Sequence, residues 1–184
     1  MASALAAALA RRSSPKVTDA APDDDCLMTL LEAAARVADH ASLRPWRVIA
    51  LRGGARERLG QALVAAAGVH GEAARKLAGK PLRAPLLLAM VGVTVPGHPK
   101  VPEWEQEASA AGVAHLLSLL LDEAGWGVMW RTGPYTRHQL IAEMHELAPN
   151  EHLLGWLYVG GLPEGGRGER RTERIAATRL STLD

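Results

Sequence analysis

Helical stretches interleaved with four short apolar runs predict a layered domain of the α/β or α+β class. The first observation is a long helical stretch over residues 101–124, where apolar residues recur every three or four positions. The second is that Gly and Pro residues separate the apolar runs from the helical stretches. The expected strands cover residues 46–52, 86–93, 128–131 and 153–159. At 184 residues the chain is long enough for one core, so we expect residues 1–184 to form a single domain.

The long helix organises the expected fold. Pro102 suits its first turn, and Gly125 is suited to end it. About twenty residues form a rod of roughly 30 Å, long enough to cross a small domain. Its first half carries small side chains over residues 108–114, so another backbone could approach closely. Its leucine-lined second half is typical of a helix that packs on a sheet. We therefore expect a second helix against the small residues, and a partner chain could supply it.

The remaining segments are assigned by the same periodicity and by their capping residues. Helices are expected over residues 2–11, 23–39, 55–67, 71–78 and 136–146, with an extended linker over residues 13–22. The segment 162–184 is rich in Gly and Arg and lacks core-forming periodicity. It is expected either to be disordered or to wrap over another surface, which in a dimer would be the partner's.

Composition excludes several classes of protein. The net charge of +1 gives no reason to expect nucleic acid or an anionic membrane as the main partner. The single cysteine, Cys26, excludes an internal disulfide and fits a reducing cytoplasm. At the N-terminus an apolar run precedes the arginines, the reverse of a secretory signal, and it is too short to span a bilayer. We expect a cytoplasmic protein without a membrane partner.

Some motifs suggest chemistry but have the wrong context. Residues 125–130 begin like a dinucleotide-binding glycine loop but lack the third glycine, and they follow a helix instead of a strand. Glu and His residues gather over 143–152 without a Glu-x-x-His or His-x-x-x-His spacing, which favours a solvated helix end over a metal site. His115, among leucines, is interpreted as a core or interface histidine.

Three polar sites remain as candidates for binding. Arg11, Arg12 and Ser13 offer two guanidinium groups and a hydroxyl, which suit a phosphate, although arginines at a helix C-terminus also complement the helix dipole. Trp130, Arg131 and Thr132 end an expected strand, where an anion or ring contact and an ordinary strand-to-turn transition are equally good interpretations.

The third site is the loop that precedes the first expected strand. Arg36 and His40 lie where the second expected helix delivers polar groups into this loop, and loops at strand ends often carry function. The alternative for His40 is a helix C-cap.

Together these motifs resemble a known family. Arg11-Arg12-Ser13, HASLRPW at 40–46, WEQE at 104–107 and GWGVMWRTG at 125–133 are similar in order and spacing to the FMN-dependent nitroreductases. The most similar branch is that of small, single-domain bacterial NAD(P)H nitroreductases. The resemblance covers roughly residues 8–162.

The resemblance implies an α+β fold with a central mixed β-sheet flanked by helices, built as an intertwined homodimer with two FMN sites at the interface. Arg11, Arg12 and Ser13 would hold the FMN phosphate and ribityl chain. Trp130, Arg131 and Thr132 would contact FMN from the same subunit, and Arg36 and His40 would line the site partly from the other chain. Larger relatives grip the phosphate with a basic residue in a C-terminal segment, where this chain has GGLPEG, so Arg131 would substitute. The Arg-rich tail 167–184 does not match the branch well.

The implied chemistry agrees with the residues. A flavin carries the hydride, so no catalytic acid–base pair and no metal are required of the protein. The leading hypothesis is an FMN oxidoreductase that passes hydride from NAD(P)H to a nitroaromatic, a quinone or a similar acceptor by a ping-pong mechanism. The second is a non-catalytic flavin-binding carrier or regulator.

Overall fold

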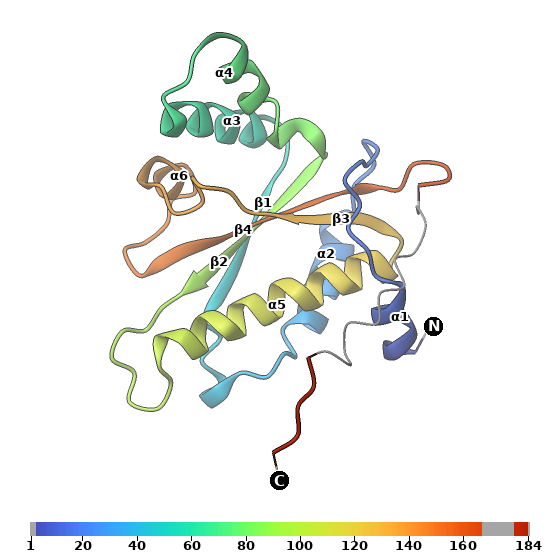
Figure 1. Cartoon of the computed structure of the whole chain (residues 1–184), viewed down its shortest axis with the longest axis vertical. Coiled ribbons are helices and arrows are strands. Elements are labelled where there is room, and N and C mark those ends of the chain that lie inside the picture. The colour runs from blue at the N-terminus through green and yellow to red at the C-terminus, as the bar shows by residue number, and fades with distance from the viewer. Residues whose placement is uncertain (1–2, 167–178, 184) are drawn as a thin grey trace.

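The computed structural model describes residues 3–166 and 179–183, and the expected strands are its centre. Four strands form one sheet in the order β1-β2-β4-β3 (Figure 1). Their bounds are β1 Trp46–Leu51, β2 Leu86–Val93, β3 Trp126–Arg131 and β4 Glu151–Gly161. All four apolar runs are therefore strands, and β3 and β4 extend beyond the expected limits.

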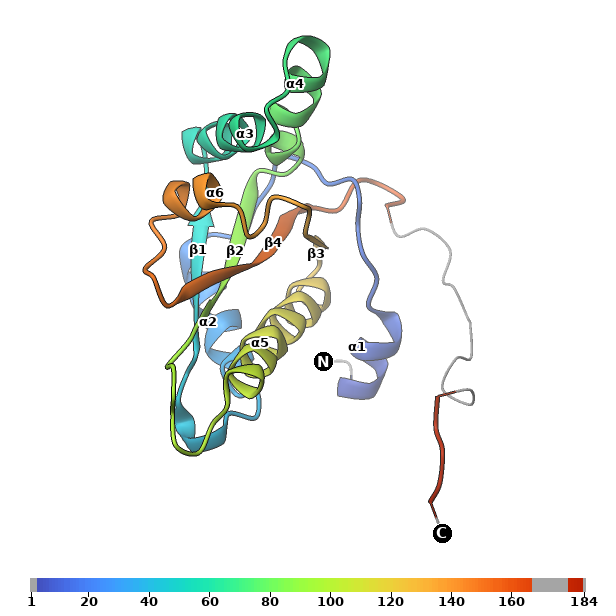
Figure 2. The ribbon, with the colours of Figure 1, turned by 60° about the vertical axis from the view of Figure 1, so that its left-hand side comes forward.

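The expectation of a mixed sheet is wrong for the described residues, because all three strand pairings are antiparallel. Two helices, α3 (Gly54–Ala67) and α4 (Gly71–Ala78), connect β1 to β2. They lie beyond one end of these strands, so the chain re-enters the sheet where it left (Figures 1 and 2). The long helix α5 (Glu103–Glu123) instead runs back along the sheet, so β3 has the direction of β2, but β4 lies between them.

Two expected helices are shorter than predicted. Helix α2 spans Asp24–Ala34 and is followed by a short loop and a single 3₁₀ turn at His40–Ser42. Helix α6 spans only Gln139–Met144. Its start is delayed because Thr136 closes a turn with Gly133, accepting from its N–H at 2.9 Å and donating to its carbonyl at 2.8 Å. The first helix, α1, spans Ala4–Ala10 and agrees with expectation to within two residues.

Helices cover both faces of the sheet (Figure 2). On one face α2 and α5 bury a core with alternate residues of β2, among them Leu86, Leu88 and Met90. On the other face α3 and α6 bury a second core with the intervening residues, among them Leu87 and Ala89. Burial on both faces explains why β2 is a continuous apolar run.

Part of the small-residue surface of α5 is occupied by the same chain. A Cβ on Gly112 would lie 2.7 Å from Cγ2 of Val37, and the Ser109 hydroxyl donates to the Ala38 carbonyl at 3.4 Å. Ala110 and Ala114 are buried in the core beside them. The close approach expected here is confirmed, but its partner is the segment after α2 in the same chain.

The segment that follows α1 crosses β3 and β4. The Ser14 N–H donates to the Val128 carbonyl at 2.9 Å, and the Thr18 N–H donates to the Gly161 carbonyl at 2.8 Å. A Cβ on Gly127 would lie 2.7 Å from Cγ1 of Val17, so glycine is needed where the segment lies flat on the strand. This crossing brings the N-terminal residues to β3. No helix in the described ranges is long and apolar enough to cross a membrane.

Candidate cofactor and substrate site

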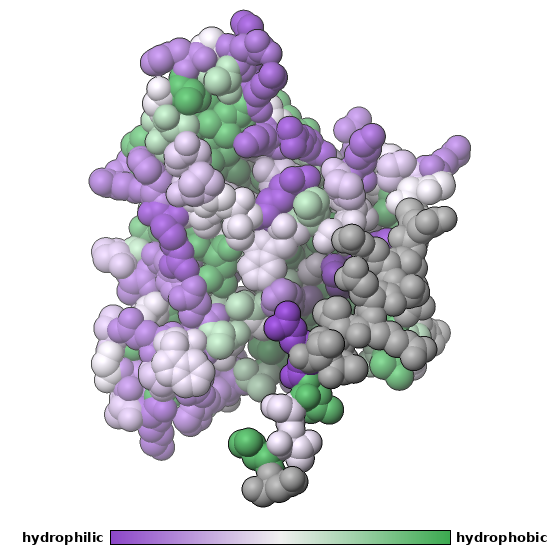
Figure 3. Space-filling model, in the orientation of Figure 1, coloured by the Kyte–Doolittle hydropathy of each residue, from purple (hydrophilic) through white to green (hydrophobic). Residues whose placement is uncertain are grey.

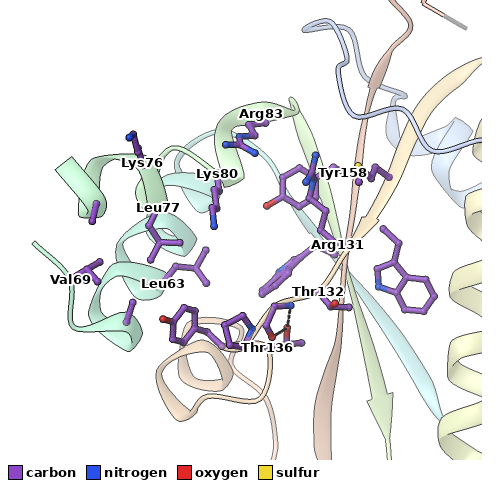
Figure 4. A pocket seen from close by; sticks show the side chains of 18 residues that line it. Leu63, Val69, Lys76, Leu77, Lys80, Arg83, Arg131, Thr132, Thr136 and Tyr158 are labelled. Atoms are coloured by element: carbon purple, nitrogen blue, oxygen red, sulfur yellow. Dashed lines mark hydrogen bonds between the residues drawn. The ribbon is translucent and has the colours of Figure 1, made fainter. Parts of the chain in front are cut away.

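A cavity of about 880 Å³ lies between the helices α3 and α4 and the ends of β3 and β4 (Figure 4). Its sheet side is formed by residues 129–136, which end β3 and turn toward α6, and by Trp156 and Tyr158 of β4. Its helical side is formed by Leu63 and Ala67 of α3, Leu77 of α4 and the residues that follow α4. This position, at the ends of strands and beneath two helices, is suited to a small molecule.

Arg131 presents a buried donor to this cavity, whereas the ring of its neighbour Trp130 packs on the opposite face of the sheet. The Arg131 guanidinium carbon lies 5.2 Å from the centroid of the Tyr158 ring, and Arg131 Nε is buried without a hydrogen-bond partner among the described residues. Nε1 of Trp130 is likewise buried and unbonded, while its ring packs edge-on against His115 at a centroid distance of 4.9 Å. Unbonded buried donors are costly. Arg131 therefore fits a ligand that carries acceptor atoms and negative charge, as FMN does.

The backbone at this end of β3 is held close to β4 by a bulge. The register of β2 against β4 shifts between Met90 and Val91, and Gly155 on the bulged strand has φ +130°. A Cβ on Gly155 would lie 2.6 Å from Trp130 Nε1 and 2.7 Å from the Arg131 carbonyl oxygen. Glycine at this position therefore allows the end of β3 to lie close to β4, which fixes the backbone positions of Trp130 and Arg131.

A buried histidine lies behind the wall of the cavity. His145 Nδ1 lies 2.7 Å from the Ile141 carbonyl, so it carries the proton, and Nε2 accepts from Trp156 Nε1 at 3.0 Å. Burial lowers the pKa of His145, which favours the neutral ring that this pair of bonds requires. The expectation of a solvated helix end was wrong for His145, because the turn after α6 folds it under β4. Glu151, another member of that group, is held by the Arg47 guanidinium at 2.6 and 2.7 Å.

His145 predicts how stability depends on pH. Its folded pKa is lowered, so its contribution to stability is complete above the unfolded pKa of about 6.5 and is lost as the pH falls toward the folded value. His145→Gln should lower the free energy of unfolding at pH 7.5 but reduce the further loss between pH 7.5 and 5.5. Urea unfolding at both pH values checks this. Burial also lowers the pKa of His152. A His152→Gln control should therefore remove part of the dependence of stability on pH that remains in His145→Gln.

The structure places the predicted site residues in three groups. Trp130, Arg131 and Thr132 all line the cavity. Arg11, Arg12 and Ser13 end α1 and lead directly into Ser14, which bonds to the middle of β3, but they do not line the cavity.

Arg36 and His40 form the third group and lie outside the cavity of their own chain. His40 Nδ1 lies 2.9 Å from Glu105 Oε1 in the first turn of α5, and Arg36 is exposed after α2. Lys80 and Arg83, which do line the cavity, were missed because they follow a short amphipathic helix without any motif.

Comparison with known proteins agrees with this architecture. The model of the nitroreductase family matches residues 8–161, so the chain belongs to that family. It is 33% identical over 160 residues to the Escherichia coli (strain K12) protein named "Putative NAD(P)H nitroreductase YdjA", covering 85% of this chain and 87% of that one.

Solved structures share the fold. The nitroreductase-like family protein from Bacillus cereus superposes with a TM-score of 0.83 at 23% identity, covering 100% of this chain and 97% of that one. A nitroreductase with bound FMN from Bacteroides fragilis gives a TM-score of 0.77 at 18% identity, with 100% of both chains covered. As a member of the nitroreductase family, the chain is an oxidoreductase.

Proposed function

We propose that the chain binds FMN and passes hydride from NAD(P)H to an electron-poor acceptor such as a nitroaromatic or a quinone. The observation that carries this is Arg131 at the end of β3, which lines a cavity of about 880 Å³ and whose Nε is buried without a hydrogen-bond partner among the described residues. FMN, when bound, supplies hydride-transfer chemistry, and the protein binds and orients the reactants.

Three groups of residues would hold the cofactor. Trp130, Arg131 and Thr132 would contact it from the end of β3. Arg11, Arg12 and Ser13 would bind its phosphate and ribityl chain, which suits guanidinium groups and a hydroxyl close to β3. Arg36 and His40 do not line the cavity of their own chain, so we assign them to the site of the partner subunit.

A site that draws on two chains requires a homodimer. The apolar side chains of α1 support an assembly, since Leu5 is 70% and Leu9 is 56% exposed. On the face shown in Figure 3 apolar atoms also gather at the end formed by α3 and α4, among hydrophilic ones. The tail that would wrap over the partner falls mostly at residues 167–178, outside the described residues. We propose one cofactor-binding domain per chain and an interface above roughly 2,000 Å², as obligate dimers have.

Ala111→Glu tests the dimer. Ala111 is half-buried on the surface of α5, and a carboxylate there would be buried without a partner in the assembly. The variant should be monomeric or aggregated and should lose FMN. Light scattering at micromolar concentration measures the mass, with Ala65→Glu on exposed α3 surface as control. A monomeric wild type would contradict the assignment.

Steady-state kinetics test the reaction. Donor and acceptor would use one cavity in turn, so double-reciprocal plots of NAD(P)H oxidation should give parallel lines. His40→Ala should lower the rate about 10- to 100-fold through lost orientation, without abolishing it. Intersecting lines would contradict a shared cavity. Absence of turnover in a protein that holds flavin would favour the carrier function instead.

The cellular compartment is also a proposal. The single cysteine, Cys26, is free and only partly buried, which suits a reducing cytoplasm.

A further inference from the structure

The charged residues that line the cavity are all basic. Its eighteen lining residues include Lys76, Lys80, Arg83 and Arg131, and this set of described residues contains no Asp or Glu. Lys76 is already paired with Glu72 at 2.9 Å, and its amino group points away from the cavity in Figure 4. Lys80 instead extends its amino group toward the cavity, and Arg83 lies at the same mouth (Figure 4).

The Tyr158 hydroxyl is a neutral hydrogen-bond donor that lines the same cavity. Burial raises the pKa of the Tyr158 hydroxyl, with Arg131 and Arg83 acting in the opposite direction, so at neutral pH the hydroxyl keeps its proton. The Tyr158 ring is buried in β4 and lies between Arg131 and the mouth that carries Arg83 (Figure 4). The mouth therefore offers two cations and one O–H donor to an incoming anion.

Part of the cavity wall is apolar. Leu63 of α3 and Leu77 of α4 face the sheet across the cavity (Figure 4). Trp156 of β4 lines the sheet side. His145 holds the Trp156 ring at its Nε1, so this wall has a fixed orientation. Such a wall suits a flat hydrocarbon ring.

We propose that the acceptor of this enzyme is a flat aromatic molecule with one acidic group, held by Lys80 and Arg83 at the mouth while its ring lies between the apolar walls. This deepens the proposed function and rests on it. The site favours such a molecule over the phosphates of a dinucleotide, because Lys80 and Arg83 lie at one mouth of the cavity and part of its wall is apolar. An extended chain of several phosphates would need cations spread along it.

The test uses two acceptors of nearly the same shape, the anion 4-nitrobenzoate and the neutral 4-nitrobenzamide, with kcat/KM measured for each. The wild type should prefer the benzoate by about tenfold or more, as expected for one charge-assisted hydrogen bond. Lys80→Gln and Arg83→Gln should each reduce this preference, and the double variant should abolish it. Arg75→Gln, an exposed residue of α4 that does not line the cavity, should leave it unchanged.

Three results would overturn the proposal. The first is a preference near unity in the wild type, and the second is a preference that survives in the double variant. The third is a double variant that loses FMN affinity or has a raised KM for NAD(P)H, since the cations would then serve the cofactor or the donor.

A binding measurement separates this inference from the proposed reaction. Calorimetry with benzoate and benzamide on the flavin-loaded protein should show benzoate binding about tenfold more tightly, and the double variant should lose that difference. Equal binding of the two overturns the inference even if turnover is found. If benzoate binds selectively but neither nitro compound is turned over, the anion site is supported and only the proposed reaction is contradicted.

Discussion

Gly155→Ala should destabilise the protein by about 2–4 kcal/mol and remove FMN binding. The new Cβ would meet Trp130 Nε1 at 2.6 Å and the Arg131 carbonyl oxygen at 2.7 Å, and φ at this residue is +130°. The end of β3 must then shift away from β4, which moves two residues that we assign to the cofactor. Urea unfolding and FMN titration measure the two effects.

Gly97→Ala is the matched control, because Gly97 has φ +66° but open space around a new Cβ. It should cost about 1–2 kcal/mol through backbone strain alone and leave FMN affinity unchanged. If both variants lose the same free energy of unfolding and both still bind FMN, the close approach of β3 to Gly155 does not position the cofactor-binding residues.

Arg131→Ala should weaken FMN binding by about 1.5–3 kcal/mol, which is about 10- to 150-fold. Arg131 lies at the end of β3 with its guanidinium against the Tyr158 ring, and its Nε is buried without a hydrogen-bond partner in the described part of the chain. A charged hydrogen bond to the cofactor is the use that this placement favours. Fluorescence titration of apoprotein with FMN gives the affinity.

Two further variants make that measurement decisive. Arg137→Ala removes a half-exposed guanidinium that pairs with Glu107 at 2.6 Å outside the cavity, so it should not change FMN affinity. Arg12→Ala should weaken FMN by a similar amount to Arg131→Ala if the N-terminal arginines bind the phosphate. Wild-type affinity in both Arg12→Ala and Arg131→Ala would refute the assigned phosphate site.

The sequence was sufficient for the strands and for the long helix. Residues 86–93 are apolar throughout because both faces of β2 are covered, and this pattern has few other interpretations. The periodicity of α5 and its Gly125 end were equally informative. Residues 130–132 could be selected because they lie at the end of an expected strand, and all three are lining residues of the cavity.

The rest depended on tertiary contacts that no local pattern encodes. Strand direction was missed because a helical connection can either cross a face, as α5 does, or turn back at one end, as α3 and α4 do. His145 seemed solvated because its burial depends on Trp156, eleven residues away in another element. Lys80 and Arg83 gain significance only when α4 is brought over the end of β3.

The central claim is that this chain is an FMN oxidoreductase, and the absorption spectrum of the purified protein tests it most directly. We expect the bands of oxidised flavin, a released cofactor whose mass is that of FMN, and bleaching of the bands by NADH or NADPH alone under anaerobic conditions. A protein without flavin, or one whose flavin stays oxidised in excess of both nucleotides, would contradict the claim.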